Sequence, residues 1–378
     1  MQPMGRDAFY LIGCALGGKQ PSRHIESSLE ELYAFCEFHS VAPMVAAALE
    51  STSDNGDAVQ KFRRSMATSL RKNILMNAER EQILRFLEEI GCWYMPLKGS
   101  LLQYDYPKFG IRQMSDNDIL IDPARQEAVH EFMLQRGYTP VSYQVTVENN
   151  YHKAPLYNFE LHTALFGAES DPKMAAYYKD VKSRLVPQQG TSFGFRFTPE
   201  DFYIYMVAHG WKHALRSGIG IRFLVDLWVW LRKHGSEMDR DYVDRELEKL
   251  GAADFERDCR HISARVLDDP EASWNLLPWE EELLDPFLSS GTYGTAQRKV
   301  SNRLHRLRSG GRFVKLRYMF ARIFPSAREL SLTHPKIMEQ RWKVPLIWAR
   351  RLARAATVRL PETLRELRMM KKSSKDQQ

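Results

Sequence analysis

The sequence predicts an α+β protein in which a small mixed sheet with helices lies between helical regions. Three observations predict this class. Residues 1–90 repeat apolar side chains at three- and four-residue intervals, as amphipathic helices do. Residues 92–166 alternate short apolar runs with amphipathic stretches, and residues 199 to about 290 return to helical periodicity. The chain has 378 residues, 44% of them hydrophobic, which suffices for two or three domains with cores.

The N-terminal helical region is predicted to cover residues 1–90. Ser27 and Ser28 provide a cap for a helix whose apolar positions continue to about residue 50. A long amphipathic helix starts near Lys61 and is expected to end at Gly91, because glycine readily adopts the left-handed conformation that closes a helix.

The central region, residues 91–198, mixes strand and helix patterns. In chain order we expect a strand at 92–98, a helix at 100–106, a strand at 117–121, a helix at 123–137, and strands at 138–147 and 155–166. This order fits a small mixed sheet with helices packed on one face. A helical domain at 199–295 and a C-terminal arm at 296–378 follow.

A short motif in the central region carries the chemistry. Lys98-Gly99-Ser100 follows an apolar run, and Asp116 and Asp118 stand one residue apart at the next predicted strand. In a strand these two carboxylates point to the same side, where they are suitable Mg2+ ligands. Gly99 lets the backbone approach a phosphate, and the helix start at Ser100 offers N–H groups to an anion. The layout therefore suits two divalent ions that hold a nucleoside triphosphate; the alternatives are a solvated strand end or Asx turn and an ordinary N-cap.

The order strand, Gly-Ser, helix and Asp-x-Asp strand resembles the signature of the nucleotidyltransferase superfamily whose best-known member is DNA polymerase beta. More closely, LKGSLLQYDYPKFGIRQMSDNDILI is similar to a family of uncharacterised nucleotidyltransferases in which LKG, a tyrosine, an arginine and D-x-D follow one another. Residues 158–166, residues 206–231 and an arginine-rich end containing IFPSARELS resemble later parts of that family. The resemblance covers most of the chain and implies a polymerase-beta-like core at 91–198, with residues 199–295 completing the nucleotide cleft.

The same resemblance implies an activity and a third acid. The activity is Mg2+-dependent transfer of an NMP from an NTP to an acceptor hydroxyl, with release of pyrophosphate. Glu160 is the third carboxylate we expect, and it shares a strand face with His162. The alternative for Glu160 is an exposed strand glutamate paired with a lysine. His162 either contacts substrate or is a hydrogen-bonded structural histidine.

Lys98 and Arg112 are the cations nearest the motif in sequence. Arg112 either reaches the triphosphate or forms a salt bridge that orients the aspartates, and Lys98 either aims at the same phosphates or faces solvent. Ser100 is expected to bind the same phosphates through its hydroxyl and N–H groups.

A second group of candidates lies on one predicted helix. His209 and His213 stand four residues apart, a zinc-binding spacing, but Gly210 occupies the place of the glutamate in H-E-x-x-H, so a zinc protease is disfavoured. The resemblance places the helix beside the cleft, where Lys212 or His213 would touch phosphates or base and His209 would contact substrate; the alternative is a helix face packed on the core. Asp226 has large apolar neighbours and needs a partner, for which Arg222, His209 and His213 are candidates.

Charge is distributed unevenly along the chain. Residues 297–378 hold 22 Lys and Arg against 5 Asp and Glu, a charge of +17, whereas residues 1–296 carry −10. The basic arm is expected either to bind RNA, an anionic membrane or an acidic protein, or to dock on the acidic body of its own chain.

The remaining expectations concern location and acceptor. Four cysteines without metal-binding spacing are expected to be reduced core thiols in a cytoplasmic protein. The N-terminus does not resemble a secretory signal, and no apolar run is long enough to span a membrane. The acceptor, a small molecule, peptide or RNA, stays open. Two alternatives to nucleotidyl transfer are a catalytically weak nucleotide-binding partner protein that uses the arm, and a phosphotransferase with the same metal site.

Overall fold

The computed structural model describes residues 1–292 apart from 53, 55, 169 and 170, and also residues 294, 342 and 344–349. The chain forms two compact units, residues 1–212 with 219–292 and residues 213–218 with 293–378. The predicted basic arm at 296–378 lies outside the described residues except for 342 and 344–349. Residues 344–349 are helical, and Val344 is buried against Ile347 and Trp348.

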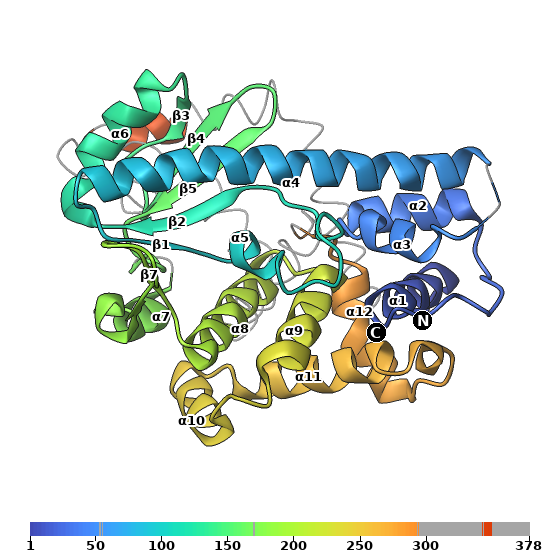
Figure 1. Ribbon diagram of the computed structural model, residues 1–378. Coiled ribbons are helices and arrows are strands. Elements are labelled where there is room, and N and C mark those ends of the chain that lie inside the picture. Colours follow the sequence, from blue (N-terminus) through green and yellow to red (C-terminus); the bar gives the residue numbers. More distant parts are fainter. Residues whose placement is uncertain are drawn as a thin grey trace. The chain divides into compact units, whose positions relative to one another are not determined.

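Helices dominate the described part of the chain (Figure 1). In chain order the α-helices are α1 (Pro3–Leu16), α2 (Leu29–Phe38), α3 (Ala42–Ala48), α4 (Asp57–Glu89), α5 (Gly99–Leu102), α6 (Gln126–Gln135), α7 (Pro172–Tyr177), α8 (Pro199–Arg216), α9 (Ile221–His234), α10 (Arg240–Leu250), α11 (Ala253–Leu267) and α12 (Pro278–Leu288). Short 3-10 turns cover Pro123–Arg125, Val181–Arg184 and Pro270–Trp274.

A five-stranded mixed sheet lies among these helices. Its strands are β1 (Tyr94–Pro96), β2 (Asn117–Ile121), β3 (Thr139–Ser142), β4 (Glu148–Lys153) and β5 (Tyr157–His162). Their order across the sheet is β1-β2-β5-β4-β3, and β2 runs parallel to β5 whereas the other neighbours are antiparallel. A separate pair, β6 (Val186–Pro187) and β7 (Phe195–Arg196), is antiparallel. The prediction of an α+β protein with a small mixed sheet is confirmed.

The two faces of the sheet differ in character because side chains alternate along each strand. On one face Ile119 and Phe159 pack with Ile83 of α4 and Met133 of α6 in an apolar cluster. On the other face Leu120 belongs to the main core, which also contains residues of α8. In this way α4 and α6 cover one face, and Asp118, Glu160 and His162 lie on the opposite face.

The element boundaries confirm some sequence predictions and correct others, such as the helix predicted at 100–106, which ends at Leu102. The long N-terminal helix ends at Glu89 and is followed by Gly91 at φ 63°, the left-handed conformation that favours glycine. The predicted strand at 117–121 has the same bounds as β2. The single strand predicted at 138–147 is wrong, because β3 stops at Ser142 and the chain turns before β4 begins at Glu148. The β-branched and aromatic residues between 138 and 147 predict a single strand because nothing in their pattern marks the turn after Ser142.

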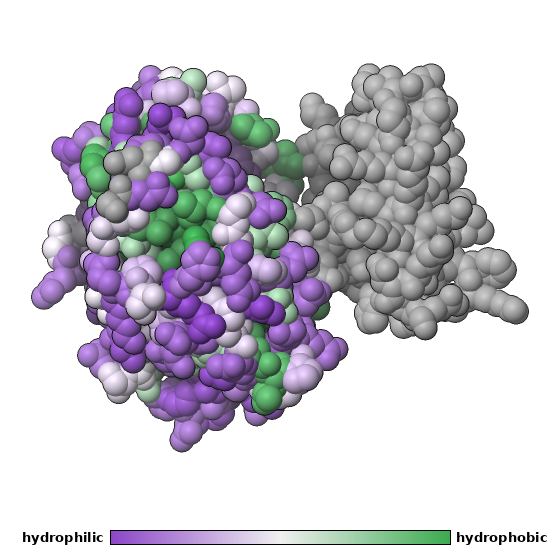
Figure 2. Space-filling view, turned by 90° about the vertical axis from the view of Figure 1, so that its right-hand side faces the viewer, coloured by the Kyte–Doolittle hydropathy of each residue, from purple (hydrophilic) through white to green (hydrophobic). Residues whose placement is uncertain are grey.

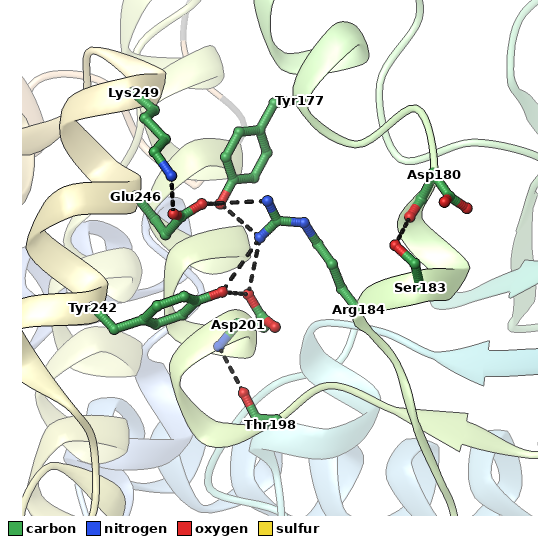
Figure 3. Close-up of polar contacts among 9 residues, drawn as sticks. All are labelled: Tyr177, Asp180, Ser183, Arg184, Thr198, Asp201, Tyr242, Glu246 and Lys249. Atoms are coloured by element: carbon green, nitrogen blue, oxygen red, sulfur yellow. Dashed lines mark hydrogen bonds and ion pairs between the residues drawn. The ribbon is translucent and has the colours of Figure 1, made fainter.

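A partly buried polar cluster ties the segment after the sheet to the helices (Figure 3). The Arg184 guanidinium donates to the Tyr177 hydroxyl at 2.8 Å and pairs with Asp201 of α8 at 3.3 Å and Glu246 of α10 at 3.2 Å. The Tyr242 hydroxyl donates to Asp201 at 3.0 Å. These contacts join four segments of the chain, so we assign the cluster a structural role.

The four cysteines of the chain are predicted to be reduced thiols in the core. All four cysteines are free and buried, which confirms the prediction of reduced core thiols.

The described part of the face drawn in Figure 2 is mostly hydrophilic, with a compact hydrophobic area near its centre. Among the described helices, none has the length and apolar character that a membrane span requires.

Stability should fall at mildly acidic pH because of His39. This side chain is fully buried at the end of α2, and its Nε2 lies 3.1 Å from the Leu288 carbonyl. Burial lowers the pKa of His39 to about 4, although the contact with Leu288 acts in the opposite direction. An unfolded histidine titrates near pH 6.5, so between pH 6.5 and 4 the unfolded chain binds the additional proton, and the free energy of unfolding should fall by up to about 3 kcal/mol.

Urea unfolding of the wild type and His39→Gln at pH 7.5 and pH 5 measures this effect. The variant should lose less stability than the wild type between the two pH values, and His24→Gln, at an exposed histidine, should behave like the wild type. An unchanged pH dependence in His39→Gln would contradict the assignment.

Candidate functional site

The predicted acids lie on neighbouring parallel strands. The register of β2 and β5 sets Asp118 directly beside Glu160. Asp118 is buried, whereas the Glu160 side chain is 22% exposed. Asp116 immediately precedes β2 and is half-buried. Alternation along the strand places Asp116 on the same side as Asp118. The structure therefore brings together carboxylates that the sequence analysis assigned from two separate segments.

Asn117 explains why the two aspartates face away from α4. Its side-chain amide donates to the Met76 carbonyl at 3.1 Å, and its amide oxygen accepts a hydrogen bond from Arg80 at 3.1 Å. Met76 and Arg80 both belong to α4, so this buried polar residue ties β2 to that helix. Because side chains alternate, anchoring Asn117 on one face fixes Asp118 on the other.

Asp118 is the centre of the polar contacts in the site. The Lys98 ammonium donates to Asp118 Oδ1 at 2.6 Å, and His162 Nε2 lies 2.9 Å from the same oxygen. His162 Nε2 is also 3.8 Å from Glu160 Oε2. One ligand atom from each of Asp118, Glu160 and His162 lies within 4.8 Å of the others, a grouping that suits a metal ion.

These contacts shift the pKa values of the acids in opposite directions. Burial raises the pKa of Asp118, but Lys98 and the hydrogen bond from His162 outweigh it, and the net shift is downward. Burial and the charge of Asp118 raise the pKa of Glu160 to about 8, and the same two causes raise the pKa of Asp116. Burial lowers the pKa of Lys98, but the neighbouring acids, Asp118 above all, make the net shift upward. Burial and the charge of Asp118 thus favour the protonated forms of Glu160 and Asp116, whereas Lys98 and His162 keep Asp118 ionised.

The chemistry of the donor atoms can be compared with the metal that the sequence predicts. Asp116, Asp118 and Glu160 offer carboxylate oxygens, which are the ligands that hard Mg2+ ions prefer. His162 offers a nitrogen, which suits zinc and other transition metals better than Mg2+. The three carboxylates therefore fit Mg2+, and His162 fits the role of a neighbour that holds Asp118 in place.

The turn from β1 to α5 is tightly packed at Gly99. Lys98 has φ 51° and ψ −124°, an uncommon conformation for a residue with a side chain, and it occupies the N-cap position of α5. A Cβ atom on Gly99 would lie 2.3 Å from Arg112 Nη1, so only glycine fits there. The Ser100 hydroxyl is buried and donates to the Leu97 carbonyl at 2.6 Å. Packing therefore fixes the turn that presents Lys98, and Ser100 is not the N-cap.

Arg112 forms a buried ion pair with Asp226 of α9. Its Nε and Nη2 donate to the two Asp226 oxygens at 2.7 and 2.9 Å, a bidentate geometry. The Tyr106 hydroxyl donates to Asp226 as well, at 2.7 Å. Asp226 is paired, as predicted, but with Arg112, which was not among the predicted partners. In this geometry Arg112 links the loop before Asp116 to α9.

Two cations beside Asp116 were not predicted for the site. Lys72 of α4 donates to the Ser115 carbonyl at 3.2 Å, and Arg222 of α9 donates to the Gln113 carbonyl at 3.1 Å. Burial lowers the pKa of Lys72, with Asp116 acting upward and Arg222 downward, so the three charged groups influence one another. Lys72 lies more than forty positions before Asp116 in a polar helix pattern, and no local signal marks it.

Three residues of α8, Lys212, His209 and His213, are predicted to contact substrate. Lys212 Nζ is 3.7 Å from Glu148 Oε1, at the start of the strand that pairs with β5. The His209 ring centroid is 6.1 Å from that of Tyr205. His213 follows on the same helix but belongs to the second compact unit. Substrate contacts by Lys212, His209 and His213 stay predictions.

The chain can be compared with solved structures, curated proteins and protein families. The chain is similar to a solved structure of an antigenic nucleotidyltransferase-like protein from Paracoccidioides brasiliensis, with 13% identity over 48% of this chain and 92% of that chain and a TM-score of 0.29. No curated protein matches. The sequence profile of a family described as "Uncharacterised nucleotidyltransferase" matches residues 26–268, which include β1 to β5 and every acid named above. This match spans more than half of the chain, and the chain therefore belongs to that nucleotidyltransferase family.

Proposed function

We propose that the protein is a Mg2+-dependent nucleotidyltransferase that moves an NMP from an NTP to an acceptor hydroxyl and releases pyrophosphate. The observation that carries the proposal is the pairing of Asp118 with Glu160 on adjacent parallel strands, with Asp116 on the same side. Membership of a nucleotidyltransferase family supports this reading of the acids.

We assign the roles of the three acids in metal binding and in proton transfer from their exposure to solvent. Asp116, Asp118 and Glu160 would hold Mg2+, which when bound would neutralise charge on the phosphates and favour the deprotonated acceptor hydroxyl. Asp118 is buried, whereas Glu160 is 22% exposed, so an acceptor reaches Glu160 more easily. We assign Glu160 to orient the acceptor hydroxyl and to assist the loss of its proton. His162 would keep Asp118 oriented through its 2.9 Å contact.

The cations around the acids would bind the triphosphate. Lys98 contacts Asp118, and Lys72 and Arg222 lie beside the loop that carries Asp116. Positive charge at these positions would stabilise the negative charge of the phosphates during in-line attack. Arg112 is engaged by Asp226, and we assign it to position the Asp116 loop and to hold the turn at Gly99.

Label transfer from α-labelled and γ-labelled NTPs tests the proposal. The protein is incubated with Mg2+, each NTP, and separate acceptor pools of small molecules, peptides or proteins, and RNA. Transfer of α-label by the wild type, absent in Asp116→Asn/Asp118→Asn, is the expected result, and the labelled pool identifies the acceptor class.

Two other outcomes of this assay would replace the proposal. Transfer of γ-label alone would indicate a phosphotransferase that uses the same acids. Tight binding of Mg-NTP without transfer to any pool would indicate a nucleotide-binding partner protein. EDTA should abolish α-label transfer, and transfer that persists in EDTA would contradict the metal requirement.

A further inference from the structure

We propose that Lys98 closes the metal site in the free protein, because its ammonium group takes the position of a cation at Asp118, and that an arriving nucleoside triphosphate draws it away. This inference rests on the proposed function and concerns how the site is regulated. It makes binding of the divalent metal and binding of the NTP cooperative, since each favours the same displacement of Lys98.

The contact geometry supports a direct competition. Lys98 Nζ lies 2.6 Å from Asp118 Oδ1, the oxygen that His162 Nε2 also contacts at 2.9 Å. Asp118 also supplies one carboxylate oxygen to the group of Asp118, Glu160 and His162 atoms that could hold a metal ion. A metal ion bound to the Asp118 carboxylate would face the Lys98 ammonium at hydrogen-bond distance from that carboxylate. Bound metal and the Lys98–Asp118 ion pair therefore exclude or weaken one another.

Burial makes an exchange of cations necessary. Asp118 is buried, and a buried carboxylate that loses its partner is strongly destabilised. Lys98 can leave Asp118 at low cost only if another cation replaces it. The Lys98 side chain is 23% exposed against 3% for Asp118, so the ammonium is the member of the pair that an incoming anion reaches. A metal-bound triphosphate supplies both parts of the exchange, an anion for Lys98 and a cation for Asp118.

The backbone conformation of Lys98 is uncommon, and its surroundings hold it in place. Its φ of 51° with ψ of −124° is disfavoured for a residue other than glycine, and such conformations persist where the surrounding structure fixes them. The next residue, Gly99, is confined by Arg112, which the buried pair with Asp226 holds in place. The strained residue thus presents its ammonium to Asp118 from a rigid support.

Binding of Mn2+ to the nucleotide-free protein, measured by electron paramagnetic resonance, tests the proposal. Lys98→Met removes the competing charge and should bind Mn2+ about tenfold more tightly than the wild type. Lys72→Met is the matched control, because it removes the same charge beside Asp116 without vacating a contact to Asp118. We expect a change of less than about threefold for this control, the effect of net charge alone.

The results separate the alternatives. If Lys98→Met binds Mn2+ no more tightly than the wild type, or only as much as Lys72→Met does, Lys98 does not occlude the site. Absence of Mn2+ binding in both the wild type and Lys98→Met overturns the inference as well. A tenfold gain without any α-label transfer would leave the inference standing while the proposed activity fails, and transfer with equal Mn2+ affinities would do the reverse.

Thermal unfolding keeps the test informative if Lys98→Met is unstable. The variant leaves Asp118 without its ammonium partner, so its melting temperature without metal should be below that of the wild type and should rise more on addition of Mn2+. Equal Mn2+-induced shifts in the two proteins would overturn the inference.

Discussion

Glu160→Gln is expected to reduce NMP transfer by about a thousandfold, equivalent to about 4 kcal/mol of transition-state stabilisation, while the protein stays folded. Glutamine has nearly the same shape, and the side chain is 22% exposed, so the sheet should tolerate the change. What the variant loses is the carboxyl group beside Asp118, which is a proposed metal ligand and the group assigned to the acceptor proton.

The matched control for Glu160→Gln is Glu148→Gln on the neighbouring strand. Glu148 pairs in register with His162 and contacts Lys212 at 3.7 Å, but it lies outside the group of atoms that could hold a metal. Its substitution should lower kcat/KM by less than about tenfold, as the loss of one nearby charge would. Steady-state kinetics of α-label transfer compare the two, and equal losses would show that Glu160 acts only through the general negative potential.

Replacing Arg112 with methionine should lower the free energy of unfolding by about 3 to 5 kcal/mol, the usual cost of leaving a buried charge unpaired. Both side chains of the Arg112–Asp226 pair are less than 10% exposed, and the contact is bidentate. In the variant, Asp226 keeps the hydrogen bond from the Tyr106 hydroxyl but loses the charge of the guanidinium. Urea unfolding followed by circular dichroism measures the loss.

Two further variants distinguish the cause of that loss. Arg257→Met breaks an ion pair with Asp254 whose side chains are 64% and 92% exposed, and it should change stability by less than about 1 kcal/mol. Arg112→Met/Asp226→Leu removes both buried charges and should recover a large part of the loss, because no unpaired charge remains. A double variant as unstable as Arg112→Met would instead indicate that the shape of the arginine, confined against Gly99, carries the stability.

Local patterns in the sequence were sufficient for the strand that carries the aspartates. The apolar run after Asp118 and the two-residue period predicted β2 with its observed bounds and put Asp116 and Asp118 on one side. The polar Asn117 between them is explained only by the structure, because its partners Met76 and Arg80 lie on α4. Glu160 was found through family resemblance, and the sheet register then set it beside Asp118.

Contacts between residues far apart in the chain could not be predicted from the sequence. Arg112 and Asp226 are separated by 114 positions, and three residues were offered as partners of Asp226 without Arg112 among them. Lys72 lies on a helix whose polar face gives no sign that one lysine turns toward the acids. Periodicity reports which face of an element is buried, whereas the identity of the neighbour depends on packing between elements.

The parallel pairing of β2 with β5 makes the divalent-metal affinity of the acidic site depend on completion of the sheet. Parallel neighbours require a long crossover, and here the chain passes through α6, β3 and β4 before it returns to set Glu160 beside Asp118. A chain with native helices but an unclosed crossover holds Asp116 and Asp118 without the third acid. Divalent-metal affinity should therefore appear late in refolding, after helical signals, and substitutions that loosen the β2–β5 pairing should first be seen as a loss of metal affinity rather than as unfolding.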